Sequence, residues 1–150
     1  MLSWLWSDPL QVGMKAPAFA LRDESGHEVS LAKLKGRNVV LVFYPGDDTP
    51  GCTRQLCEMR DNWGALAGHG IAVYGVNPAG PEKHKKFREK YHFPFPLLVD
   101  TGQKIAALYH ADGLWVKRTV YLIGPDGVIR FAQRGMPKPG EVMKAAVPAK

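Results

Sequence analysis

Both cysteines of this 150-residue chain lie in one short stretch, YPGDDTPGCTRQLCEM, residues 44–59. Cys52 directly follows a turn-forming run of Pro, Gly and Asp, and Cys57 comes five residues later. A cysteine thiolate is both a nucleophile and an oxidisable group. The pattern therefore indicates redox or nucleophilic chemistry at Cys52, with Cys57 as a candidate partner.

The residues around Cys52 predict that a helix begins at this thiol. Thr49 offers a hydroxyl at or near the cap position, and Pro50 and Gly51 allow a tight turn into the helix. Backbone N–H groups in a first helical turn lack intrahelical partners and carry partial positive charge. We therefore expect the pKa of the Cys52 thiol to lie below the value of about 8.5 for a free cysteine.

The spacing of the two cysteines leaves two interpretations open. In one regular helix, Cα atoms five residues apart are about 8–9 Å apart and about 140° apart around the axis. A disulfide needs Cα atoms within about 7 Å of each other. Either the first turns unwind before the sulfurs meet, or Cys57 is unrelated to Cys52. Taken alone, Cys57 is better explained as a buried structural residue.

An arrangement that separates two thiols until a helix unwinds suits a reaction in two steps. A Cys52 thiolate attacks an O–O bond and becomes a sulfenic acid, and Cys57 then condenses with it to form a disulfide and water. External thiols reduce that disulfide by exchange.

Hydrophobic periodicity alternates between strand-like and helix-like along the chain. Strands are expected at 19–23, 27–31, 38–45, 71–77 and 96–100, and in a hairpin over 118–135 whose turn is Pro-Asp-Gly. Helices are expected at 52–67, 81–91, 101–110 and 140–147. This order predicts an α/β, thioredoxin-like three-layer sandwich with a central mixed β-sheet flanked by helices. We expect one domain over 1–150, with 1–10 as an N-terminal extension containing Trp4 and Trp6.

Composition argues against several other classes of protein. Apolar residues make up 45% of the chain, but no apolar run approaches the roughly 20 residues that cross a bilayer. The N-terminus does not read as a secretory signal, so a cytoplasmic protein without a membrane partner is expected. The five histidines are scattered without ligand spacing, so we expect neither a metal nor a cofactor.

The formal net charge of +6 raises the question of nucleic acid. The clearest basic cluster, at 83–90, is interrupted by Glu82 and Glu89 nearby and is typical of the solvated face of a helix. No nucleic-acid partner is expected. Asp47 and Asp48 are interpreted as turn residues, and Phe93, Phe95 and Tyr109 as core residues.

The motif Pro45-x-x-x-Thr49-x-x-Cys52 resembles the active-site pattern of the peroxiredoxins. The longer stretch FYPGDDTPGCTRQLCEMRD is similar to the bacterioferritin comigratory protein subfamily, also called Q-type peroxiredoxins. The resemblance covers nearly the whole chain, from VGMKAPAFAL to RTVYLIGPDG. One departure is Gly124, at a position where that family often has an acidic residue; it does not touch the proposed chemistry.

The resemblance implies a thiol-dependent peroxidase for hydrogen peroxide and organic hydroperoxides. Cys52 corresponds to the peroxidatic cysteine and Cys57 to the resolving cysteine of an atypical two-cysteine mechanism. A thioredoxin or glutaredoxin-type reductant would recycle the enzyme, and a monomer or weak homodimer is implied.

The same resemblance assigns roles to four other residues. Arg118 falls where the family places its catalytic arginine, which lowers the thiolate pKa and stabilises charge on the breaking O–O bond; on its own it would be a surface arginine. Thr49 would bond peroxide and thiolate. Pro45 would shield the pocket, and the Gly51 and Cys52 amides would bind peroxide oxygens.

Two other functions compete with this one. A thioredoxin-type thiol–disulfide oxidoreductase would have two residues between its cysteines, whereas four lie between Cys52 and Cys57. A basic nucleic-acid-binding or chaperone-like module would function with both thiols alkylated and would lose nucleic-acid affinity steeply with salt.

Overall fold

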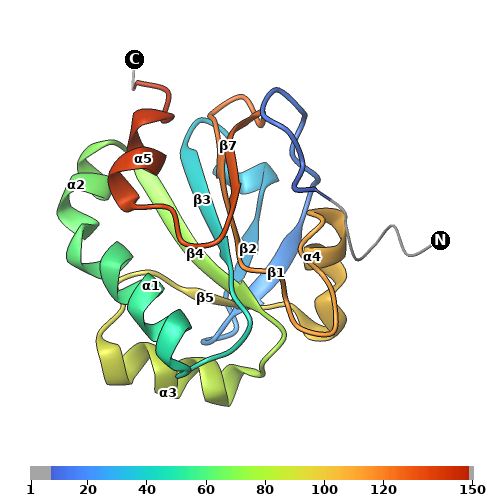
Figure 1. Ribbon diagram of the computed structural model, residues 1–150, viewed down its shortest axis with the longest axis vertical. Helices are drawn as coiled ribbons and strands as arrows, with labels where there is room; N and C mark the ends of the chain where they lie inside the picture. The colour runs from blue at the N-terminus through green and yellow to red at the C-terminus, as the bar shows by residue number, and fades with distance from the viewer. Residues whose placement is uncertain (1–7, 149–150) are drawn as a thin grey trace.

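A computed structural model describes residues 8–148, apart from the side chain of Cys52. In this part of the chain seven strands form one sheet in the order β2-β1-β5-β4-β3-β6-β7 (Figure 1). The strands are β1 Ala20–Asp23, β2 Glu28–Ser30, β3 Asn38–Phe43, β4 Ile71–Asn77, β5 Leu97–Val99, β6 Thr119–Ile123 and β7 Ile129–Arg134.

The sheet is mixed, as expected. β3, β4 and β5 run parallel, whereas β6 lies antiparallel to β3 on one side and β1 antiparallel to β5 on the other. Every residue of β3 is buried, because its β-branched and aromatic side chains pack against helices on both faces. The β6–β7 hairpin turns through Gly127, whose φ of +83° favours glycine.

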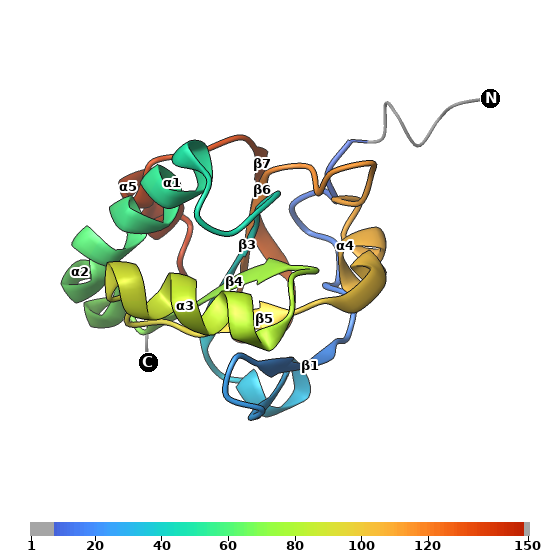
Figure 2. The ribbon, with the colours of Figure 1, turned by 90° about the horizontal axis from the view of Figure 1, so that it is seen from below.

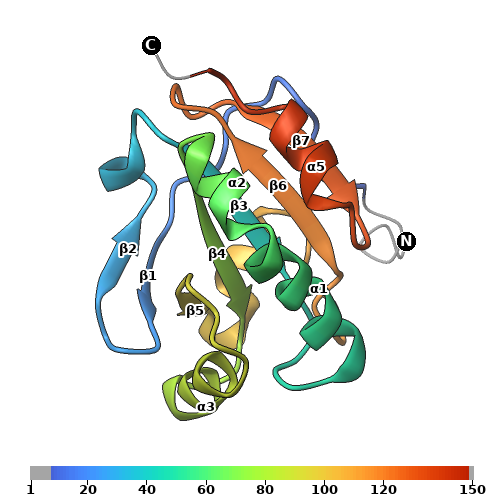
Figure 3. The same ribbon diagram turned by 90° about the vertical axis from the view of Figure 1, so that its left-hand side faces the viewer.

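Helices cover both faces of this sheet (Figures 2 and 3). One face packs against α1 Pro50–Asp61, α2 Trp63–Gly68, α3 Pro81–Tyr91 and α5 Pro139–Lys144, which together bury Leu56, Met59, Leu66, Phe87 and Val142. The other face packs against α4 Lys104–Leu108 and the N-terminal segment, where Leu10, Phe19 and Tyr109 are buried. Short 3-10 turns occupy Ala32–Leu34 and Thr101–Gln103. The predicted thioredoxin-like α/β sandwich is confirmed.

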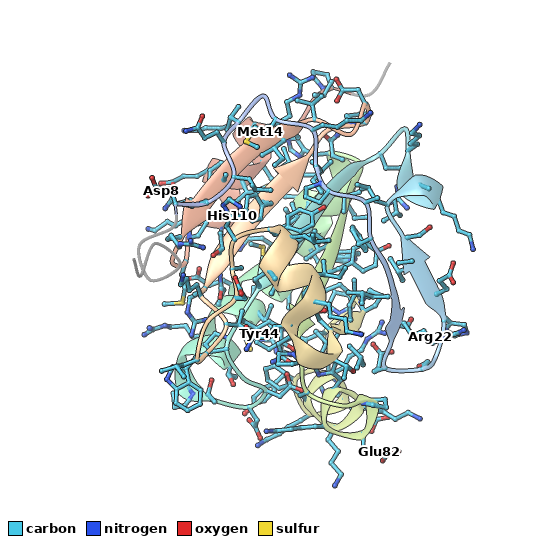
Figure 4. All side chains as sticks on the ribbon, turned by 90° about the vertical axis from the view of Figure 1, so that its right-hand side faces the viewer. Asp8, Met14, Arg22, Tyr44, Glu82 and His110 are labelled. Atoms are coloured by element: carbon cyan, nitrogen blue, oxygen red, sulfur yellow. The ribbon has the colours of Figure 1, made fainter. Side chains whose placement is uncertain are left out.

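The N-terminal segment is tied to the α4 face from its first described residues. Leu10 donates its N–H to the Tyr121 hydroxyl at 2.9 Å, and His110 Nδ1 lies 3.1 Å from the Asp8 carbonyl oxygen (Figure 4). Residues 8–10 therefore pack on the domain. Trp4 and Trp6 lie outside the described residues.

The predicted helix over 52–67 is wrong in two details. It begins at Pro50, and it breaks at Asn62, so α1 and α2 are separate helices. The Asn62 side-chain N–H₂ donates to the Glu58 carbonyl oxygen at 2.8 Å, a local bond that competes with helix propagation. The apolar stripe nevertheless faces the core as expected, and the core positions of Phe93, Phe95 and Tyr109 are confirmed.

Two surface features bear on the class of protein. The lysines of the basic cluster, Lys83, Lys85, Lys86 and Lys90, are exposed along α3, in agreement with a solvated face. Within residues 8–148, no helix has both the length and the apolar character needed to cross a membrane.

Candidate active site

The predicted start of a helix near Cys52 is confirmed. β3 delivers the chain into a loop at 44–49, Thr49 is the N-cap of α1 and Pro50 is its first residue. The Thr49 hydroxyl does not cap the helix; it donates to the Gly46 carbonyl oxygen at 3.2 Å. Thr49 itself is exposed, so its hydroxyl lies at the protein surface.

Cys52 is the third residue of α1, and Cys57 lies five residues further along the same helix. The side chain of Cys52 lies outside the described part of the structure, but its backbone is helical. Because both residues belong to one regular helix, their Cα atoms are separated by more than a disulfide can span. The two cysteines cannot be joined while α1 is intact.

Cys57 lies half-buried on the inner side of α1. It packs against the core cluster that contains Leu56, Met59 and Phe95. Burial raises the pKa of the Cys57 thiol, the nearby Arg60 opposes that shift and Asp61 adds to it. Cys57 is therefore a protonated, weakly reactive thiol at neutral pH in this conformation.

Arg118 lies against the first turn of α1, although the two are distant in sequence. Antiparallel pairing of β3 with β6 places Thr119 opposite Phe43, so the residue before β6 reaches the end of β3 where the loop begins. A Cβ atom added to Gly51 would lie 3.2 Å from Arg118 Nη2. The absence of a side chain at Gly51 is what lets the guanidinium approach the helix so closely.

Gln55 holds this arginine in place and was missed by the sequence analysis. It is 2% exposed, and its Oε1 accepts a bond of 2.8 Å from Arg118 Nη1. Its Nε2 donates to the Gly135 carbonyl oxygen at 3.3 Å, and the Gly135 N–H donates to the Arg118 carbonyl oxygen at 2.8 Å. The available signal was its spacing: a polar residue three positions after Cys52 lies on the same side of the helix.

Asp47 and Asp48 lie in a turn, as interpreted, but both also have side-chain partners, which the sequence did not indicate. Asp47 is buried and interacts with Tyr44, Asn77 and His84. Asp48 is exposed and interacts with Lys90 and Tyr91. The loop before α1 is thus attached to α3, as Figure 1 shows where the loop passes along that helix.

The predicted residues come together in part. Thr49, Gly51 and Arg118 surround the backbone position of Cys52, and Pro45 is an exposed residue of the same loop. First-turn N–H groups and a guanidinium create positive potential at this point. Such a site stabilises a thiolate and can bind the oxygens of a small polar substrate.

Comparison with known proteins places this arrangement in context. Residues 12–132 match the model of the AhpC/TSA family. The chain is 40% identical over 140 residues to peroxiredoxin Q, chloroplastic, of Oryza sativa subsp. japonica, which covers 88% of the chain and 64% of that protein. It is also 40% identical over 144 residues to a Mycobacterium tuberculosis protein provisionally named a peroxiredoxin, covering 90% and 92% of the two chains.

Two solved structures of proteins named peroxidoxin or peroxiredoxin share this fold. Peroxidoxin BcpB from Mycobacterium tuberculosis superposes with a TM-score of 0.85 at 28% identity, covering 91% of this chain and 96% of that one. Peroxiredoxin Q of Xanthomonas campestris superposes with a TM-score of 0.79 at 25% identity, covering 85% and 90%.

Proposed function

The chain belongs to the AhpC/TSA family, in its peroxiredoxin Q and Bcp group, and from this premise we propose that it is a thiol-dependent peroxidase. Its substrates would be hydrogen peroxide and organic hydroperoxides. The names of the relatives indicate the class of reaction, and the steps below are argued from the residues of this chain.

In the first step the Cys52 thiolate attacks the terminal oxygen of ROOH. The S–O bond forms as the O–O bond breaks, which oxidises the sulfur to a sulfenic acid and releases RO⁻; that oxyanion takes a proton to leave as ROH. Arg118 would stabilise both the thiolate and the charge on the departing oxygen, and the Gly51 and Cys52 amides would bind the peroxide oxygens. Thr49 would bond the peroxide, and Pro45 would shield the thiolate from water.

In the second step the Cys57 sulfur attacks the Cys52 sulfenic acid. A disulfide forms, and the sulfenic hydroxyl leaves as water with the Cys57 proton. This step needs α1 to unwind between the two residues. Unwinding also takes Cys57 away from the core, which removes the burial that raises the pKa of its thiol.

The disulfide is then reduced by two electrons from an external dithiol. We propose a thioredoxin or glutaredoxin-type reductant, acting by thiol–disulfide exchange, and a monomer or weak homodimer. We retain the cytoplasm as the compartment, although the rice relative is named as chloroplastic. One domain over 1–150, with 1–10 as an N-terminal extension, stays a prediction.

One observation supports this proposal most strongly. The Arg118 guanidinium is held by Gln55 against Gly51, the residue before Cys52. If Cys52 had only a structural role, an arginine held beside its helical turn by a buried glutamine would have no purpose. A thioredoxin-type exchange enzyme is disfavoured, because its two thiols must meet without rearrangement, and here an intact helix keeps them apart.

The test is peroxide consumption by the reduced protein, its Cys52→Ser variant and its Cys57→Ser variant. We expect the wild type to lose both thiols to a stoichiometric amount of peroxide and to yield one intramolecular disulfide by mass spectrometry. Cys57→Ser should accumulate the sulfenic acid, which dimedone traps. Peroxide removal by Cys52→Ser at the wild-type rate would refute the proposal.

A further inference from the structure

The carboxyl group of Asp47 is fully buried, and the proposed reaction does not use it. Its Oδ1 accepts from the Tyr44 hydroxyl at 2.6 Å and from Asn77 Nδ2 at 3.1 Å, and its Oδ2 lies 2.5 Å from His84 Nδ1. The side chains of Asp47 and His84 are both 0% exposed. Such a pair is retained only if its hydrogen bonds offset the cost of removing it from water.

The bonding pattern shows how the pair is satisfied. His84 Nε2 lies 2.9 Å from the Leu98 carbonyl oxygen, which can only accept, so Nε2 has a proton. The contact between Nδ1 and the carboxylate then needs one further proton, held by the ring or by the carboxyl group. In both cases each ring nitrogen of His84 is bonded, and the ring has one fixed orientation.

The partners of Asp47 come from the rigid part of the fold. Asn77 is the last residue of β4, His84 lies in α3 and Leu98 lies in β5. Asp47 itself lies two residues before the N-cap of α1. One buried carboxylate therefore joins the loop before the candidate active-site helix to the ends of the parallel strands and to α3.

Asp48 makes a second attachment on the outside of the same loop. It has a φ of +58°, and it is exposed whereas Asp47 is buried. Its carboxylate accepts from Lys90 Nζ at 2.8 Å and from the Tyr91 hydroxyl at 2.7 Å, both in the last turn of α3. The loop is thus bonded to α3 from the inside through His84 and from the outside through Lys90.

We propose that Asp47 and His84 are positioning residues that hold loop 44–49 in place and so favour the wound form of α1. The proposal rests on the proposed function, in which peroxide reacts with the wound helix and the disulfide forms only after unwinding. An attached loop keeps Thr49 and the first-turn amides around Cys52, and it confines unwinding to the segment after Asp48. Asp47 and His84 therefore set the balance between the two steps.

The test compares Asp47→Ala, which removes every bond of the carboxylate, with Asp47→Asn, which can keep the bonds to Tyr44 and Asn77. Stopped-flow measurement separates the peroxide-dependent oxidation of Cys52 from the concentration-independent formation of the disulfide. We expect Cys52 of Asp47→Ala to be oxidised at least about tenfold more slowly than in the wild type, which corresponds to the loss of one or two good hydrogen bonds. The disulfide of this variant should form faster than that of the wild type. Asp47→Asn should recover most of the oxidation rate.

Glu24→Gln is the matched control. Glu24 is also a buried carboxylate bonded to α3, through Arg88 Nη1 at 2.8 Å, but it accepts its other bonds from the Leu97 N–H and the Ser25 hydroxyl and not from loop 44–49. This variant should lose stability without shifting the two rates in opposite directions. Should Asp47→Ala fail to fold, Lys90→Met removes one of the two bonds of the exposed outer attachment, and we expect changes of the same signs and of about twofold.

Hydrogen exchange of the reduced protein, measured without peroxide, separates this proposal from the function. We expect faster exchange of the amides at 53–56 in Asp47→Ala and no such change in Glu24→Gln. Unchanged exchange there, or two rates that fall together as in the control, would overturn the positioning role. Thiols that survive peroxide while the exchange effect persists would instead refute the peroxidase.

Discussion

At the scale of single residues, the candidate site depends on how an arginine is aimed. Arg118 approaches the first turn of α1 because Gly51 has no side chain, and Gln55, one turn further along the same helix, bonds the guanidinium through Nη1. An arginine with free side-chain rotation would lose conformational entropy each time it bound a developing negative charge. The buried glutamine removes most of that freedom in advance.

Arg118→Met should slow the oxidation of Cys52 by about a hundredfold, the typical effect of losing one group that stabilises a developing oxyanion. Arg118→Lys should recover part of the loss, since lysine keeps the positive charge but lacks the planar guanidinium with its several N–H donors. The matched control is Arg130→Met, because Arg130 is a partly exposed arginine whose partner, Asp126, lies in the β6–β7 turn. Equal rates for Arg118→Met and Arg130→Met would exclude Arg118 from the reaction.

The residues whose roles could be predicted from sequence were those whose roles depend on their immediate neighbours in the chain. Thr49, Pro50 and Gly51 reveal a helix start through their own backbone preferences. Asp47 and His84 could not be paired in this way, because they are 37 positions apart and become neighbours only when β4 and α3 pack. An aspartate in a turn-like stretch looks the same whether or not a histidine faces it.

At the scale of the element, α1 determines when the two sulfurs can meet. It contains both cysteines, it begins at an exposed loop and its inner side packs against the core through Leu56 and Met59. Its first turn is therefore less strongly held than its middle. Local opening from that end is the route that costs least, since it exposes little apolar surface.

Helix propensity before Cys57 should then control the rate of disulfide formation. Arg54 is exposed, so Arg54→Ala and Arg54→Gly remove the same side-chain contacts and differ by about 1 kcal/mol in helix propensity. We expect the glycine variant to form its disulfide about fivefold faster than the alanine variant after the same oxidation. At high peroxide concentration, mass spectrometry should also detect less overoxidised Cys52 in the glycine variant than in the alanine variant.

The same pair of changes at Lys86, an exposed position in α3, provides the control. That helix does not have to unwind, so its Ala and Gly variants should form the disulfide at similar rates. An Ala-to-Gly difference at Lys86 as large as that at Arg54 would mean that global stability, not α1, sets the rate.

The positions of the elements could be predicted better than their ends. The β4 and α3 ranges agree with the expected residues, because a buried strand and a proline-started helix have strong local signals. The break at Asn62 was missed, since the apolar stripe continues through Met59, Trp63 and Leu66 as if the helix were unbroken. A side-chain bond to a backbone carbonyl ends α1 without disturbing that pattern.

At the scale of the whole molecule, the sheet acts as the fixed frame for a helix that must move. β3 lies between β4 and β6 (Figure 3). The loop that leaves β3 is therefore flanked by Asn77 at the end of β4 and by Arg118 just before β6. The thioredoxin-like order of elements could be predicted from periodicity, and it explains why these residues converge. The strength of each attachment depends on tertiary contacts that one sequence does not display.

The separation of Cys52 and Cys57 by an intact α1 is tested most directly by hydrogen exchange of that helix before and after oxidation. The amides at 53–57 should be protected in the reduced protein, lose protection when a stoichiometric amount of peroxide has converted both thiols to one intramolecular disulfide, and regain it on reduction. A disulfide between these two cysteines that forms while those amides stay protected would contradict the mechanism.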